Sequence, residues 1–138
     1  MAMTAEEKQA MKETMAERSK ARKKMTPEQL EAEVLEKVAV MARADRAIAE
    51  RIHELVKAHA PSLQAKTWYG MQAYCNAEGK TVVFFQDSGK FKTRYCTLGF
   101  QDAAQLDEGS MWPTSYAVNE ITPAIEKQIT ELIKRAVS

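Results

Sequence analysis

The spacing of hydrophobic residues divides the chain into helical and extended segments. Between residues 26 and 59 apolar side chains recur every three or four positions, and the same period returns after residue 121. This period places the apolar side chains on one face of an α-helix. It predicts helices over 26–41, 45–59 and 122–137, each with one face to bury.

Residue types at the helix ends support these boundaries. Thr26 precedes Pro27, which fits the first turn of a helix, and the Gln29 side chain is placed to bond the amide of residue 26 in a capping box. The pair at 122–123 repeats the threonine and the proline. Pro61 predicts the end of the second helix, since a proline disfavours helical geometry in the residue before it.

The middle of the chain has the composition of a sheet and its turns. All ten aromatic residues and all five glycines lie between residues 68 and 116. The candidate strands are 66–74, 81–86, 91–100 and 114–119, and a short capped helical turn is expected at 102–106. The order of helices, strands and a final helix predicts an α+β fold, with an antiparallel sheet of three to five strands packed by helices on one face.

A polar helix is expected at the start of the chain, over residues 4–24. Its residues favour helix formation, but its apolar stripe consists only of Ala10, Met11, Thr14 and Met15. Because such a helix buries too little to be stable alone, we expect it to fray or to pack on a partner subunit, which would form a homo-oligomer. Residues 1–25 are thus assigned as a helical extension and residues 26–138 as a single α+β domain.

Charge adds one feature to this organisation. The 20 basic and 19 acidic residues give a net charge of +1, which favours neither nucleic acid nor a membrane as the partner. Five cations nevertheless lie between residues 18 and 24: Arg18, Lys20, Arg22, Lys23 and Lys24. Four glutamates over residues 6–17 offset most of this charge, so we do not expect nucleic-acid binding. Binding of nucleic acid or another anion through residues 18–24 stays the alternative function.

Candidate catalytic chemistry is sparse. His53 and His59 are six residues apart and therefore lie on different helix faces, so we expect an exposed His53 and a boundary His59 rather than a metal site. Cys75 and Cys96 match no zinc spacing and are expected as small, partly buried strand residues in the reduced state. We expect no enzymatic activity and no cofactor. Without an apolar leader or a membrane-spanning run, the protein is expected in the cytoplasm.

The aromatic residues suggest where a ligand would bind. Trp68 and Trp112 are candidates for the walls of a pocket, while Lys92 and Arg94 supply cations for a small anionic ligand or a protein partner. In the alternative, both tryptophans and Tyr69 close the core between the sheet and the helices. The candidate ligand-binding residues are Trp68, Tyr69, Lys92, Arg94, Tyr95 and Trp112.

Two strings carry a family resemblance. WYGM at 68–71, followed by AY at 73–74, and LDEGSMWP at 106–113 are similar to the YdhG-like family, a bacterial domain family of largely unknown function. The segments VVFF at 82–85 and KFKTRY at 90–95 add to the likeness, which covers about half of the chain or more. Gln72 departs from the proline expected there in that family.

The resemblance implies a compact α/β sandwich similar in shape to frataxin. One family member is described as an iron-handling chaperone that serves iron–sulfur assembly, so iron is implied by resemblance only. The densest acidic group is Asp102, Asp107 and Glu108, which are the candidate metal ligands because iron prefers carboxylate oxygens. The sequence therefore predicts a non-enzymatic binding or chaperone-type domain.

Overall fold

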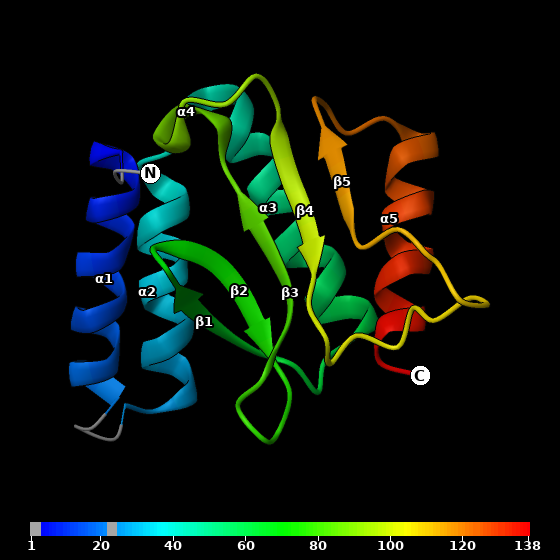
Figure 1. Ribbon diagram of the computed structural model, residues 1–138, viewed down its shortest axis with the longest axis horizontal. Coiled ribbons are helices and arrows are strands. Elements are labelled where there is room, and N and C mark those ends of the chain that lie inside the picture. The colour runs from blue at the N-terminus through cyan, green and yellow to red at the C-terminus, as the bar shows by residue number, and fades with distance from the viewer. Residues whose placement is uncertain (1–3, 22–24) are drawn as a thin grey trace.

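The structure, a computed structural model, describes residues 4–21 and 25–138, with the side chains of residues 16–21 left out (Figure 1). The elements, in chain order, are α1 (Ala5–Ala21), α2 (Pro27–Ala39), α3 (Arg43–His59), β1 (Gln64–Trp68), β2 (Met71–Cys75), β3 (Thr81–Gln86), α4 (Ser88–Phe91), β4 (Cys96–Phe100), β5 (Ser115–Val118) and α5 (Pro123–Ala136). The three main predicted helices are confirmed to within a few residues, as are the strands β3 and β5.

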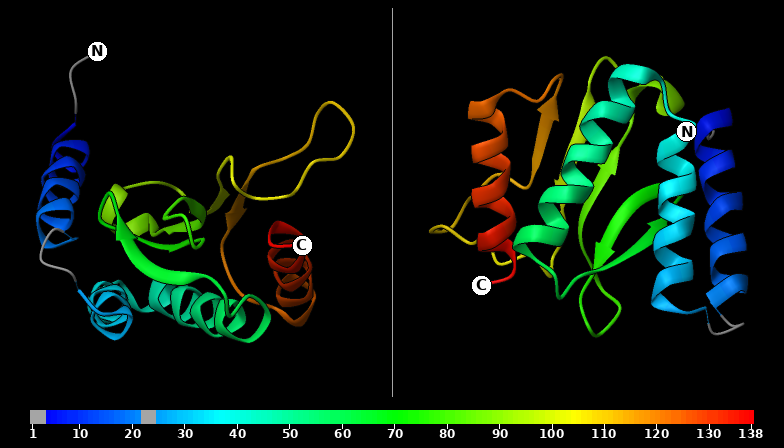
Figure 2. Two further views of the ribbon diagram at one scale, coloured as in Figure 1. Left: turned by 90° about the horizontal axis from the view of Figure 1, so that it is seen from below. Right: turned by 180° about the vertical axis from the view of Figure 1, so that it is seen from behind.

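The five strands form one antiparallel sheet in the order of the chain, β1-β2-β3-β4-β5. Helices α2, α3 and α5 lie behind it on one face in the view of Figure 1, and the view from below separates the two layers (Figure 2). The α+β fold with a sheet covered by helices on one face is thus confirmed. The opposite side, which α2, α3 and α5 do not cover, is called the open face below.

The core lies between the sheet and these three helices. Cross-strand partners such as Tyr74, Val83 and Phe100 point to the same side and are at most 4% exposed. The predicted capping box is present: the Thr26 hydroxyl accepts from the Gln29 amide at 3.1 Å, and the Gln29 side chain accepts from the Thr26 amide at 2.8 Å. Local caps and burial of one helix face therefore act together.

The first predicted strand, 66–74, is wrong because it contains a turn. β1 ends at Trp68 and β2 begins at Met71, with Tyr69 and Gly70 at φ angles of 51° and 73° between them. Positive φ at both central residues is the geometry of a type I′ hairpin turn. Such turns favour asparagine or glycine at the first position. Because Tyr69 occupies that position, the sequence gives no turn signal here.

The predicted strand over 91–100 is correct only from Cys96 onward. Asp87 accepts from the Lys90 amide at 3.1 Å and so begins the short helix α4, which ends at Lys92 in the left-handed conformation, φ 55°. Asp87 directly follows β3, so this cap starts a helical turn there, and pairing with β3 begins again only at β4. Residues 102–106 form turns rather than the expected helical turn.

The N-terminal helix is confirmed, but its surroundings differ from the prediction. α1 lies against β1 and α4 of its own chain, with Ala10 and Thr14 only 6% and 8% exposed. Its ion pairs reach Lys90, far away in the sequence, so no local pattern shows them. A homo-oligomer through α1 stays a prediction. Residues 22–24 and the side chains of Arg18 and Lys20 lie outside what the structure describes.

Candidate binding surface on the open face of the sheet

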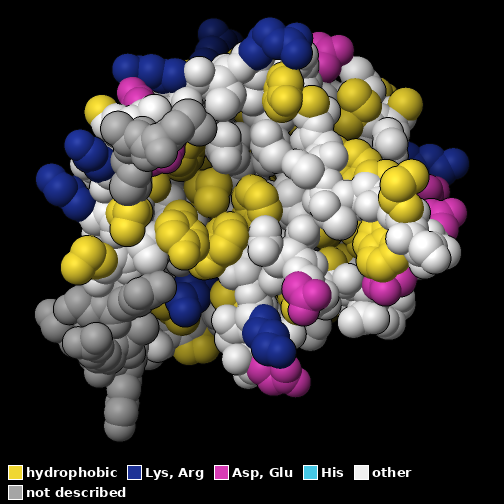
Figure 3. Space-filling view, viewed as in Figure 1, with side chains coloured by type: hydrophobic (Ala, Val, Ile, Leu, Met, Phe, Trp, Pro, Cys, Tyr) yellow, Lys and Arg dark blue, Asp and Glu magenta, His cyan; other side chains and the backbone are white. Residues whose placement is uncertain are grey.

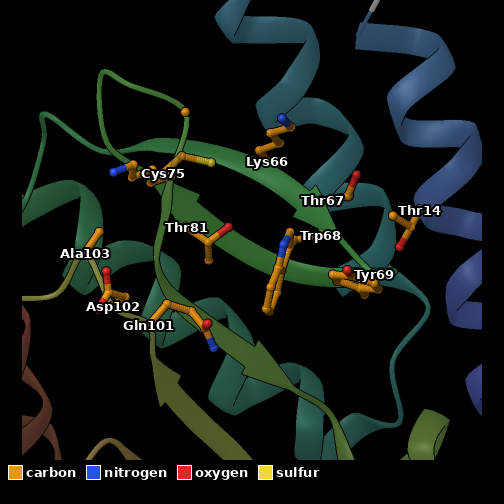
Figure 4. A pocket seen from close by; sticks show the side chains of 12 residues that line it. Thr14, Lys66, Thr67, Trp68, Tyr69, Cys75, Thr81, Gln101, Asp102 and Ala103 are labelled. Carbon is orange, nitrogen blue, oxygen red and sulfur yellow. The ribbon is translucent and has the colours of Figure 1, made fainter.

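The open face carries a hollow of about 470 Å³. Figure 3 shows hydrophobic side chains gathered over the strands on this side. The hollow runs from the tip of the β2–β3 turn to α1, and Figure 4 shows Trp68 near its middle. Its lining includes Thr14, Lys66, Trp68, Tyr69, Cys75, Lys80, Thr81, Gln101 and Asp102.

The apolar floor of this hollow is aromatic. Alternation along β1 turns Trp68 away from the helices. Its ring lies 5.3 Å from that of Phe84 and meets the Tyr69 ring edge-on at 4.9 Å, between centroids. The Phe84 ring lies directly over Gly99, where an added Cβ would approach it to 2.2 Å. The missing side chain at position 99 thus leaves room for the Phe84 ring, which is tilted by 49° to that of Trp68.

Polar groups surround this floor. Lys66 stands two residues before Trp68 on β1 and so points to the same side of the sheet. Burial raises the pKa of the Cys75 thiol, although the Lys66 ammonium and a hydrogen bond with Thr81 act against the shift. The protonated thiol is therefore favoured, which makes Cys75 a small lining group rather than an activated nucleophile.

Helix α1 closes one end of the hollow. Thr14 faces the β1 side of the cavity, and its hydroxyl donates to the carbonyl of Ala10 at 3.0 Å (Figure 4). At the other end lie Gln101 and Asp102, on the segment that follows β4. The cavity is thus built from the sheet, one loop and the N-terminal helix together.

The structure brings together only some of the predicted ligand-binding residues. Trp68 and Tyr69 line the hollow, whereas Trp112 packs against the core and is not among the lining residues. The prediction of a pocket walled by both tryptophans is therefore wrong. Trp112 follows the alternative in which the tryptophans close the core, because its side chain is partly buried against the core cluster.

The predicted cations lie elsewhere. Lys92 and Arg94 precede β4 instead of belonging to it, so they do not share a strand face with Cys96. The Lys92 ammonium pairs with Glu6 of α1 at 2.8 Å. The Arg94 guanidinium lies 5.3 Å from the centre of the Tyr95 ring, and both side chains are exposed. Neither Lys92 nor Arg94 lines the hollow, whereas Lys66, which was not a predicted site residue, does.

The three candidate metal ligands do not form a site. Asp102 lines the hollow, Glu108 lies 3.7 Å from Arg135 on α5, and Asp107 is exposed. Within residues 4–15 and 25–138, no three His, Cys, Asp or Glu side chains are grouped so that they could hold a metal ion. The donor set therefore does not fit the iron that the resemblance implies.

The sequence did not predict a buried network of hydrogen-bonded side chains between the sheet and the helices α2 and α3. Gln72, 0% exposed, donates from Nε2 to the Ala49 carbonyl at 3.0 Å and to the Tyr74 hydroxyl at 2.7 Å. Tyr74 lies 2.8 Å from Nδ1 of His53, whose Nε2 lies 2.8 Å from Glu31. The prediction of an exposed His53 is wrong, since only 7% of it is exposed. A polar residue at 72 between apolar strand neighbours was the available signal.

A second buried group surrounds Asp45 at the start of α3. Its carboxylate accepts from the Gly89 amide at 2.8 Å, the Ser88 hydroxyl at 3.0 Å and the Cys96 thiol at 3.2 Å. Burial favours the protonated form, but these hydrogen bonds prevail and hold the pKa of Asp45 below its usual value. Asp45 thus ties α3 to α4 and β4 instead of capping its own helix, whose N-cap is Ala42.

Comparisons with known proteins identify no relative. No protein-family model, curated protein or solved structure matches the chain. In the part of the chain that the structure describes, none of the helices has the length and apolar character needed to cross a membrane.

Proposed function

We propose that the protein is a non-enzymatic binding domain that holds a small molecule with a flat apolar part and an anionic group. The observation that carries the proposal is the hollow of about 470 Å³ on the open face, with Trp68 and Lys66 side by side on β1. Its volume lies within the roughly 300–1,000 Å³ of typical small-molecule pockets.

The lining groups favour this ligand chemistry. The ring of Trp68, which packs against Phe84, offers flat apolar surface for stacking. Lys66 and Lys80 supply positive charge from one side, and Thr81 and Gln101 offer hydrogen bonds. Asp102 at the far end disfavours an anion there, so the anionic group is expected near Lys66.

The sequence interpretation supports the same class of function. The resemblance to the YdhG-like family implies a binding or chaperone-type domain, and we carry over that class without its iron. Cys75 and Cys96 are both buried free thiols, which favours a reducing compartment, and we propose the cytoplasm.

A single-tryptophan variant tests the proposal. Trp112→Phe leaves Trp68 as the only tryptophan, and 1-anilinonaphthalene-8-sulfonate provides fused aromatic rings with one anionic group. We expect saturable energy transfer from Trp68 to the bound dye. Lys66→Ala should weaken binding about three- to tenfold, the effect of losing one charge-assisted contact. Lys127→Ala, an exposed lysine on α5, is the matched control and should leave the affinity unchanged.

Equal affinities for the Lys66→Ala and Lys127→Ala variants, or dye binding without energy transfer from Trp68, would overturn the proposal. The natural ligand can then be sought by native mass spectrometry of the protein purified from its own cell. An added mass that Trp68→Ala removes, while circular dichroism shows the fold intact, would identify it.

A further inference from the structure

A single carboxylate ties α1 to two other elements. Glu13 Oε2 lies 2.6 Å from Nζ of Lys90 on α4, and 2.9 Å from Nζ of Lys37 on α2. The Glu13 side chain is only 13% exposed. Lys90 also donates to the Gly70 carbonyl at 3.0 Å, so the ammonium is held at the turn between β1 and β2. Both lysines thus belong to elements other than α1, and the Gly70 carbonyl holds the Lys90 ammonium independently of Glu13.

The remaining contacts of α1 are small or ionic. Among its described side chains, the buried ones are Ala10 and Thr14, whereas Met11 and Met15 are 48% and 68% exposed. Glu6 pairs with Lys92 at 2.8 Å at the other end of the helix. Because little apolar surface is buried, hydrophobic packing contributes little to the docking. We infer that the ion pairs of Glu6 and Glu13 contribute more to holding α1 on the domain.

We propose that Lys37 and Lys90 form a binding site for a small oxyanion, a carboxylate or a phosphate, which the Glu13 carboxylate fills as an internal ligand. The site lies in a cavity of about 500 Å³ between α1, α2 and α4, lined also by Gly70 and Gly89. Asp87 borders the same cavity, but its carboxylate accepts from the Lys90 amide at 3.1 Å. An oxyanion that takes the place of Glu13 releases α1.

Release of α1 has a consequence for the open face. Thr14 leaves the end of the hollow that contains Trp68, so the hollow becomes longer and more open. This consequence rests on the proposed function, whereas the oxyanion site does not. The tests below therefore measure the protection of α1 and the binding of phosphate, and they can fail or succeed independently of dye binding at Trp68.

Hydrogen exchange at the amides of residues 9–15 tests the role of Glu13. Glu13→Gln keeps the shape of the side chain and removes its charge, and it should raise exchange in α1 about tenfold with the rest of the domain unchanged. Glu7→Gln is the matched control, because the hydrogen bonds described for Glu7 run to Thr4 at the start of the same helix. Raising NaCl from about 0.05 to about 0.5 M should speed exchange in α1 more in the wild type than in the Glu13→Gln variant, which keeps only the Glu6–Lys92 pair of the ion pairs described above.

Phosphate binding tests the vacated site. The Glu13→Ala variant should bind inorganic phosphate when titrated in a calorimeter at matched ionic strength. The double variant Glu13→Ala, Lys37→Ala should not bind it. Acetate in a parallel titration shows whether a carboxylate binds as well as a phosphate. Equal α1 exchange in the Glu13→Gln, Glu7→Gln and wild-type proteins, or no phosphate binding by Glu13→Ala, would overturn the proposal.

Discussion

The hydroxyl of Tyr74 lies 2.8 Å from Nδ1 of His53, deep between the sheet and α3. Burial, together with the charge of Glu31, raises the pKa of Tyr74 far above its ordinary value, although the hydrogen bond from Gln72 opposes the shift. The phenol therefore keeps its proton and donates it to Nδ1. His53 then carries its own proton on Nε2 and donates to Glu31. Each donor in the chain from Gln72 to Glu31 thus meets an acceptor.

Tyr74→Phe should destabilise the protein by about 1–3 kcal/mol, because one N–H of the Gln72 amide and Nδ1 of His53 lose the hydroxyl that they bond. The ring stays in place, so packing is preserved. Urea unfolding measures the loss. Tyr95→Phe, at a side chain 37% exposed, is the control and should change the free energy of unfolding by less than about 0.5 kcal/mol. Equal effects of the two substitutions would contradict the assignment of a buried network.

Gly99→Ala should destabilise the fold by about 1–3 kcal/mol, because the new Cβ would lie 2.2 Å from the Phe84 ring. The clash is with one side chain, so a smaller residue at position 84 should relieve it. In a double-mutant cycle, Gly99→Ala is therefore expected to cost less in a Phe84→Leu background than in the wild type. Additive effects of the two substitutions would show that the Phe84 ring does not cover position 99.

Asp45→Asn should lower stability at neutral pH, since an amide cannot replace a carboxylate that accepts from Gly89, Ser88 and Cys96. The lowered pKa of Asp45 means that its ionised form stabilises the folded state above the unfolded value, about 3.9. This contribution is lost as the pH falls through the lower, folded pKa. The gap between the wild type and Asp45→Asn in unfolding experiments should therefore narrow below about pH 4.

Asp87→Asn should have the opposite sign. Burial, with the nearby charge of Asp45, raises the pKa of Asp87, so its protonated form favours the folded state and stability is lost as the pH rises through that pKa. The amide oxygen of asparagine can still accept from the Lys90 amide and preserve the cap. At neutral pH Asp87→Asn should be as stable as the wild type or more so. If Asp87→Asn lowered the free energy of unfolding as much as Asp45→Asn does, the expectation that the neutral side chain favours the folded state would be wrong.

The helices were accessible from the sequence because their signals are local. Thr26 and Gln29 stand three residues apart and complete a capping box without help from the rest of the chain. The strand boundaries were less accessible at two places. Tyr69 adopts a positive φ because the hairpin around it requires one, and Asp87 starts a helical turn inside an apparent hairpin. Both depend on neighbours that tertiary pairing supplies.

The candidate site was accessible in part for the same reason. Trp68 and Tyr69 stand out as neighbouring aromatic residues, and both line the hollow. Lys66 does not stand out, because its significance comes from sharing the open face with Trp68. Trp112 stands out equally well but packs against the core and does not line the hollow.

By itself the sequence determined the long helices, the strands β3 and β5 and the α+β class, because periodicity and caps act over a few residues. Only the tertiary structure decided that His53 is buried, that Glu13 binds two lysines from other parts of the chain, and which face of the sheet stays open. These features join residues 21 to 77 positions apart. Such pairings depend on how the elements pack, and that packing minimises exposed apolar surface over the whole chain at once.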